Sequence, residues 1–129
     1  IVRGAVPEML SLFDFPEPSI VAGTRNVTTV PTQALFMMNS DAVADLSQHF
    51  AKRLLLGDSG AEERVALGYR IAISRDPTSE EVARAVAFVV DAETMLQQVD
   101  KMDVAESQLT AWAGFCQSLL ASSEFRYLN

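Results

Sequence analysis

The sequence predicts an all-α protein, a bundle of about five helices with a long N-terminal loop. Apolar residues recur at helical spacing in five stretches, and no segment alternates apolar and polar residues over the length of a strand. The 129 residues include only six glycines and five prolines, which is typical of a globular chain. A chain of this length buries about two thirds of its extended surface on folding. We therefore expect one all-α domain over residues 1–129.

The first two helical stretches lie in the N-terminal half of the chain. Residues 7–13 combine a proline that suits a first helical turn with apolar residues at helical spacing. Residues 14–29 contain Pro, Gly and Asn without a period, which predicts a long loop, and loops of that length are often functional. The second stretch, about 31–57, has a break and a new N-cap at Asn39-Ser40. Beyond the break it carries an apolar stripe, which consists of Val43, Leu46, Phe50 and Leu54.

The last three stretches are joined by short connectors, which favours antiparallel neighbours. Residues 60–73 have apolar residues on more than one side, so this helix should be the most enclosed. The next helix, from Thr78 to about 102, begins with a capping box because Glu81 follows Thr78 by three residues. The final helix, about 104–122, has an apolar face roughly 140° wide.

Charge and cysteine content exclude several classes of protein. Seventeen acidic and ten basic residues give a net charge of −7, which disfavours binding to nucleic acid. No apolar run is long enough to span a membrane, so we expect no transmembrane segment and a soluble chain. A single cysteine, Cys116, excludes an internal disulfide and metal sites built on cysteine pairs.

No pattern of residues indicates catalysis or metal binding. His49 follows Asp45 by four residues on a helix, which predicts a surface pair of these side chains. Cys116 lies on the apolar face of the last helix, where a thiol acts as a small hydrophobic group. The neighbouring acids, such as Glu80-Glu81, fit helix N-termini. We therefore predict no catalytic residue and no metal ligand.

The segment over residues 24–33 is the one candidate binding site. It combines a basic side chain, hydroxyl groups and a helix N-terminus, whose free N–H groups favour an anion. The candidate binding residues are Arg25, Asn26, Thr28, Thr29, Thr32 and Gln33. They would form a pocket for a small anion or carboxylate, or a docking site for a neighbouring domain. The structural alternative is that Thr28 or Thr29 caps the helix while Arg25 binds the protein's own acids.

Three motifs carry a family resemblance: LFDFPEP at 12–18, RNVTTVPTQALFMMNS at 25–40 and EFRYLN at 124–129. They resemble the C-terminal part of the planctomycete-type domain of unknown function, fifteen fifty-three in the usual series, and the resemblance runs over nearly the whole chain. Two departures are visible. The family commonly reads leucine-glycine-arginine where this chain has Ile73-Ser74-Arg75, so the left-handed helix end that glycine favours is open to question. It also commonly reads asparagine-serine-asparagine where this chain has Ala121-Ser122-Ser123, so no role of those asparagines carries over.

The resemblance implies a C-terminal fragment of a large, exported, multidomain bacterial protein, located in the periplasm or at the cell surface. Such proteins often contain a cytochrome c-like region upstream of this domain. The haem-attachment motif Cys-x-x-Cys-His is absent from these 129 residues. We therefore expect no cofactor in this chain, and any haem would belong to another part of the parent protein.

The expected function is a non-catalytic interaction or structural module. It would dock against the upstream domains of its own polypeptide through the 14–29 loop and neighbouring helix faces. In isolation, exposed Phe13, Phe15 and Ile20 would favour a homodimer. The alternative is an accessory part of a carbohydrate-processing or periplasmic redox protein, in which the site is complete only in the full-length chain.

Overall fold

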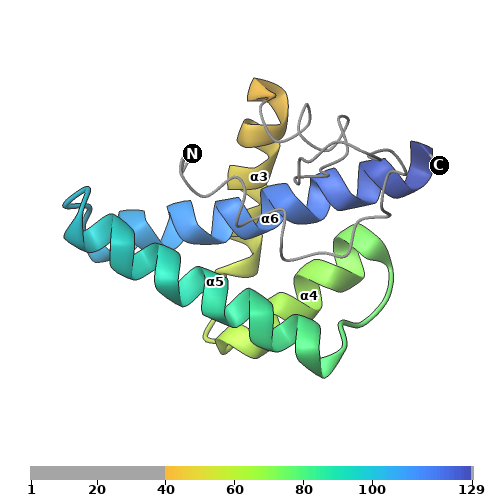
Figure 1. Cartoon of the computed structure of the whole chain (residues 1–129), viewed down its shortest axis with the longest axis horizontal. Coiled ribbons are helices and arrows are strands. Elements are labelled where there is room, and N and C mark those ends of the chain that lie inside the picture. Colours follow the sequence, from red (N-terminus) through yellow and green to blue (C-terminus); the bar gives the residue numbers. More distant parts are fainter. Residues whose placement is uncertain (1–39, 129) are drawn as a thin grey trace, which may run out of the picture.

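The computed structural model describes the backbone of residues 40–128 and the side chains up to residue 123. This part of the chain forms four helices and no strand: α3 (Asp41–Leu54), α4 (Ala61–Ile73), α5 (Ser79–Gln98) and α6 (Val104–Leu128) (Figure 1). The all-α prediction is confirmed here, and the four helices match the last four predicted ones. The helices expected over 7–13 and 31–38, and the 14–29 loop, lie outside the described residues.

Helix α3 begins at the predicted cap, because the Ser40 hydroxyl accepts a hydrogen bond from the Val43 N–H at 3.4 Å. Its predicted apolar stripe is wrong at one position. Leu46 is 56% exposed, and Ser47 takes its place on the buried face. The Ser47 hydroxyl donates to the Val43 carbonyl at 2.6 Å, so this polar group is satisfied inside the helix and can be buried.

Helix α4 ends in a left-handed residue even though glycine is absent there. Ser74 has φ 66° and ψ 29°, and its N–H donates to the carbonyls of Tyr69 at 3.0 Å and Arg70 at 3.1 Å. Ser74 thus adopts the left-handed conformation that glycine favours at this helix end, at some cost in backbone strain.

Helix α5 begins with the predicted capping box. Glu81 N–H donates to the Thr78 hydroxyl at 3.1 Å, and Thr78 N–H donates to the Glu81 carboxylate at 2.9 Å. The helix ends at Gln98, four residues before the predicted end. Residues 74–78 join α4 to α5, and these two helices cross at a wide angle, whereas α5 and α6 run in roughly opposite directions (Figure 1). The predicted antiparallel order is thus seen for α5 and α6.

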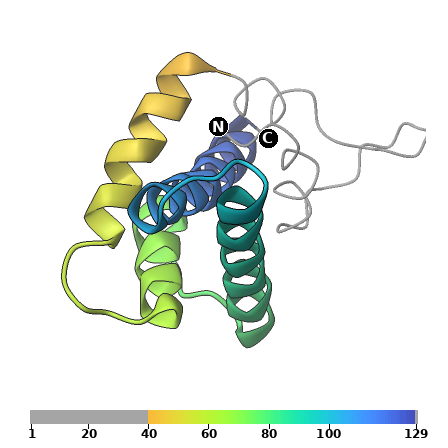
Figure 2. The same cartoon turned by 90° about the vertical axis from the view of Figure 1, so that its left-hand side faces the viewer.

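Helix α6 is the central element, with α3, α4 and α5 on three sides of it (Figure 2). Residues 111–119 are all buried, so the whole circumference of the helix is covered over this length. The predicted apolar face of roughly 140° is therefore too narrow. Helix α4 was expected to be the most enclosed, but only Val65, Gly68 and Tyr69 are buried on it. Small residues such as Ala111, Ala113 and Gly114 allow close packing against α6.

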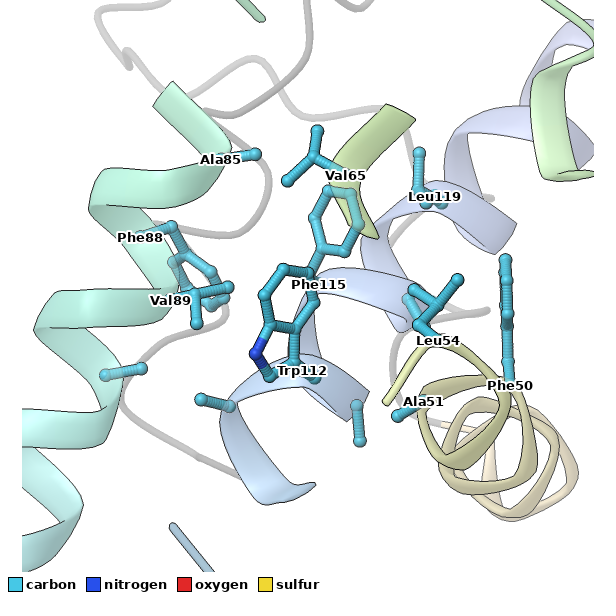
Figure 3. Close-up of a cluster of buried hydrophobic side chains, with 14 of the residues drawn as sticks. Phe50, Ala51, Leu54, Val65, Ala85, Phe88, Val89, Trp112, Phe115 and Leu119 are labelled. Atoms are coloured by element: carbon cyan, nitrogen blue, oxygen red, sulfur yellow. The ribbon is translucent and has the colours of Figure 1, made fainter. Parts of the chain in front are cut away.

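The core is built around two aromatic residues of α6 (Figure 3). Trp112 and Phe115 pack edge to face, with ring centroids 5.6 Å apart. Side chains of α3, α4 and α5 surround them, among them Leu54, Val65 and Val89. A Cβ atom added at Gly68 would lie 3.1 Å from side-chain atoms of both Phe115 and Leu119, so this glycine permits the close approach of α4 to α6.

Candidate interaction grooves

The predicted binding residues all fall outside the described residues. These are Arg25, Asn26, Thr28, Thr29, Thr32 and Gln33, and the apolar Phe13, Phe15 and Ile20 lie there as well. The anion-pocket and domain-docking roles of this segment therefore stay predictions. The same holds for the carbohydrate and redox alternatives, which depend on the same residues.

The two single-residue candidates are placed by the structure. His49 is exposed, and its Nδ1 donates to the backbone carbonyl of Asp45 at 3.0 Å. The expected pairing with the Asp45 side chain is thus replaced by a bond to the backbone of the preceding helical turn. Cys116 is fully buried, as predicted, and burial raises the pKa of its thiol well above the usual range. A thiol in this state is chemically unreactive.

The acidic pairs at helix starts serve the helices, as predicted. Glu63 and Glu81 each accept a hydrogen bond from the backbone N–H of the residue before their helix, at 3.2 Å and 2.9 Å. Within residues 40–128, no group of three His, Cys, Asp or Glu side chains is placed to hold a metal ion.

Glu81 also forms an ion pair that sequence reasoning missed. Arg75 donates from both terminal guanidinium nitrogens to its two carboxylate oxygens, at 2.8 Å and 2.9 Å. The Arg75 hydrogen bonds and the Thr78 N–H lower the pKa of Glu81 to about 2, and Glu81 in turn raises the pKa of Arg75. The guanidinium lies 5.5 Å from the ring centroid of Tyr69. The cluster of Tyr69, Arg75 and Glu81 links the end of α4 to the start of α5.

Glu93 on α5 is the other carboxylate with a perturbed pKa. Partial burial raises its pKa, and the positive charge of Arg64 on α4 opposes this rise without forming a close ion pair in the described part of the chain.

The first surface feature is a groove between three helices, which we call the α3–α4–α6 groove. It has a volume of about 480 Å³, and its lining residues are Leu46, His49, Phe50, Arg53, Ile71, Ala72, Leu120 and Ser123. Leu46 and Ile71 are 56% and 40% exposed. Among the described residues, Arg53 and His49 are the ionisable side chains in this lining, and no described acid contributes to it. The groove is therefore apolar with a cationic edge.

The second feature lies between α4 and the outer side of α5, and we call it the α4–α5 groove. It has a volume of about 750 Å³, and its lining residues are Glu62, Ser79, Val82, Ala83, Val86, Ala87, Val90 and Asp91. Val90 is 52% exposed. Glu62 and Asp91 are the ionisable lining residues, and both are exposed. This groove is apolar with an acidic edge, the opposite of the first.

Sequence reasoning missed both grooves for different reasons. Leu46 was assigned to the core stripe of α3, which hid its place on a surface. On α5, Ala83, Ala87 and Val90 follow one another at i, i+4 and i+7 on the side opposite the core residue Val89. That second apolar stripe on one helix is the signal that could have indicated a surface groove.

The family match agrees with the motifs in the N-terminal part. Residues 1–89 match the profile of PSD1, described as a protein of unknown function (DUF1553). The chain belongs to this family. The DUF1553 match includes the motifs at 12–18 and 25–40, but it ends within α5 and leaves out the third motif, at 124–129. The resemblance was expected over nearly the whole chain, and the matched part is shorter.

Other comparisons add little to the DUF1553 assignment. No curated protein and no solved structure gave a match. None of the helices in the described part of the chain is long and apolar enough to cross a membrane.

Proposed function

We propose that this DUF1553 chain is a non-catalytic interaction module of an exported multidomain protein, and that it docks against an upstream part of the same polypeptide. The α3–α4–α6 groove carries the proposal. Its occupant would be an apolar segment that bears at least one carboxylate. The candidate residues Arg25 to Gln33 would add a second contact of the same anion-binding character.

Exposed apolar side chains supply the binding free energy in this proposal. Leu46 and Ile71 lie on different helices and both face solvent, while Phe50 forms part of the groove and of the core. Full burial of a leucine or isoleucine side chain is worth about 1.5–3 kcal/mol, so covering the exposed half of each gives about 1 kcal/mol. Contiguous exposed apolar surface of this kind is typical of an interaction site.

The charges at the edge select the kind of occupant. Arg53 and His49 are both exposed, and no acid among the described lining residues would neutralise the charge of Arg53. A segment with a carboxylate beside its apolar side chains would therefore pair with Arg53 as it docks. Such rim charges contribute mainly to orientation and association rate.

The helices that form the α3–α4–α6 groove are held in place by the core of the protein itself. The groove walls come from three helices that share one core, and Phe50 packs in that core. A preformed groove lowers the entropic cost of binding, which favours a docking role for a surface with few exposed apolar side chains.

Thiol labelling tests the proposal directly. Leu46→Cys places a reactive group in the groove, while the native Cys116 is buried with a raised pKa and gives little background. We expect a maleimide to label Cys at position 46 about tenfold more slowly in the longer parent polypeptide than in the 129-residue chain. Leu56→Cys is the matched control, because Leu56 is 73% exposed outside the groove and should label equally in both. Equal labelling at position 46 in the two proteins would refute docking through this groove.

A further inference from the structure

We propose that the α4–α5 groove binds an amphipathic helix of a partner protein, and that this helix carries lysine or arginine residues beside its apolar face. This site is separate from the α3–α4–α6 groove and shares no lining residue with it.

The floor of the groove has the form that helix packing requires. Ala83, Ala87 and Val90 are exposed and form one row along α5, with Val82 and Val86 half-buried beside them. Alanines in such a row allow a second helix to approach closely, and helices pack with axes about 8–10 Å apart. The lining of α5 extends from Ser79 to Asp91, which is about 18 Å along the helix axis at 1.5 Å per residue. About three turns of a partner helix would fit this length.

Two carboxylates set the charge of the groove. Glu62 comes from the first turn of α4, and Asp91 comes from α5. Both side chains are exposed, and no basic residue is among the described residues that line the groove. A partner helix is therefore favoured when its positive charges meet these carboxylates, and lysines or arginines near a helix C-terminus are also favoured by the helix dipole.

The same charges argue against other occupants. Residues 1–39 of this chain contain only two basic residues, Arg3 and Arg25, whose separation of 22 positions corresponds to about 33 Å in a helix. A three-turn segment from this region therefore brings at most one positive charge to the two carboxylates. A second copy of the chain carries the same net charge of −7, and anionic lipid and nucleic acid are repelled by the acidic edge. A cationic helix from another protein is the occupant that fits.

The test uses a synthetic helix as the probe. A fluorescent peptide of about 15 residues has leucines at i, i+3, i+4 and i+7 and lysines in its last two turns. We expect saturable binding to the 129-residue chain in fluorescence anisotropy, weakened by added salt. The same peptide with glutamate in place of lysine should not bind. Failure of the lysine peptide to bind at millimolar protein would overturn the proposal.

Variants of the chain locate the site of binding. Val90→Lys should abolish binding of the lysine peptide, and the pair Glu62→Gln with Asp91→Asn should weaken it about tenfold. Val99→Lys is the matched control, because Val99 is 70% exposed at the C-cap of α5 beyond the groove, and the variant should bind within about twofold of the parent chain. Thermal unfolding of each variant checks the fold. Equal effects of Val90→Lys and Val99→Lys would show non-specific attraction and refute the site.

Two further outcomes separate this proposal from its competitors. Leu46→Asp alters the α3–α4–α6 groove and should leave peptide binding unchanged, so the two grooves succeed or fail independently. In analytical ultracentrifugation, the chain alone should not form a dimer through this groove. A dimer of that kind would be recognised by its loss in the Val90→Lys variant. A dimer with that property would show that a second copy occupies the groove, and it would overturn the assignment to a cationic partner.

Discussion

Glu81 makes more contacts than its place in a capping box requires. Its carboxylate accepts hydrogen bonds from Thr78 N–H and from two nitrogens of Arg75. The side chain of Glu81 is 15% exposed and that of Arg75 is 37% exposed, so solvent screens the pair on one side. The charge of Glu81 is thus both a local cap and a link between two helices.

Glu81→Gln isolates the charged part of this link, since glutamine can still accept from Thr78 N–H. The pKa of Glu81 is lowered from 4.5 to about 2 in the folded chain, so the carboxylate stabilises the fold above pH 4.5 and this contribution is lost as the pH falls toward 2. We expect the variant to lose about 1 kcal/mol at pH 7 in urea unfolding, and the difference from the parent chain to vanish near pH 2.

The matched control is Glu80→Gln. Glu80 is exposed in the same first turn, and its side chain makes no hydrogen bond or ion pair within the described part of the chain. Its replacement should cost less than about 0.5 kcal/mol, through the helix dipole alone. Equal losses for the two variants would mean that Arg75 adds nothing in solution.

At the scale of the element, the end of α4 stores backbone strain. Ser74 has a positive φ of 66°, and a residue with a Cβ atom pays about 1 kcal/mol for this conformation. Ser74→Gly should therefore raise the free energy of unfolding by about 0.5–1 kcal/mol, and Ser74→Val should lower it by more than 1 kcal/mol because β-branched residues resist the left-handed region. Thermal and urea unfolding measure both. A destabilising Ser74→Gly would contradict the left-handed helix end.

The starts of the helices could be predicted from sequence because they depend on neighbouring residues. Ser40 and the pair Thr78 and Glu81 cap α3 and α5 as expected. Burial of whole helices could not be predicted in this way. Ala113 and Gly114 lie outside the apolar face predicted for the last helix, yet both are buried in the folded chain. Leu46 was wrongly assigned to the core. Ser47 occupies the buried face of α3 instead, because its hydroxyl forms a hydrogen bond within the helix.

The surface sites show the same limit at the scale of the whole molecule. The α3–α4–α6 groove combines Leu46, Ile71 and Leu120 from three helices, and no spacing along the chain connects them. The α4–α5 groove is formed mostly by residues of one helix, so the sequence contains its apolar stripe on α5. The site predicted from sequence, residues 24–33, rests on a motif, and the motif is part of the matched DUF1553 segment. Motif reasoning thus identifies the family, while the grooves need the fold.

The family match and the folded unit have different boundaries. The match ends at residue 89, yet α6 begins at Val104 and lies at the centre of the described helices. Seven of the seventeen residues in the described core cluster belong to α6, including Trp112, Phe115 and Leu119. The α3–α4–α6 groove also needs Leu120. The matched segment therefore depends on residues outside it for its core.

Truncation tests this dependence. Removing one buried Phe or Trp side chain costs about 3–5 kcal/mol, and a domain is stable by only about 5–15 kcal/mol, so losing Trp112 and Phe115 together with the rest of α6 exceeds what the fold can tolerate. We expect a fragment of residues 1–103 to show no cooperative thermal transition by circular dichroism at 222 nm, whereas the full chain shows one. Adding a peptide of residues 104–129 should restore the transition, because the same core contacts can form between two chains. Cooperative unfolding of the 1–103 fragment by itself would show that the DUF1553 segment folds without α6 and that the central position of this helix is not what holds α3, α4 and α5 together.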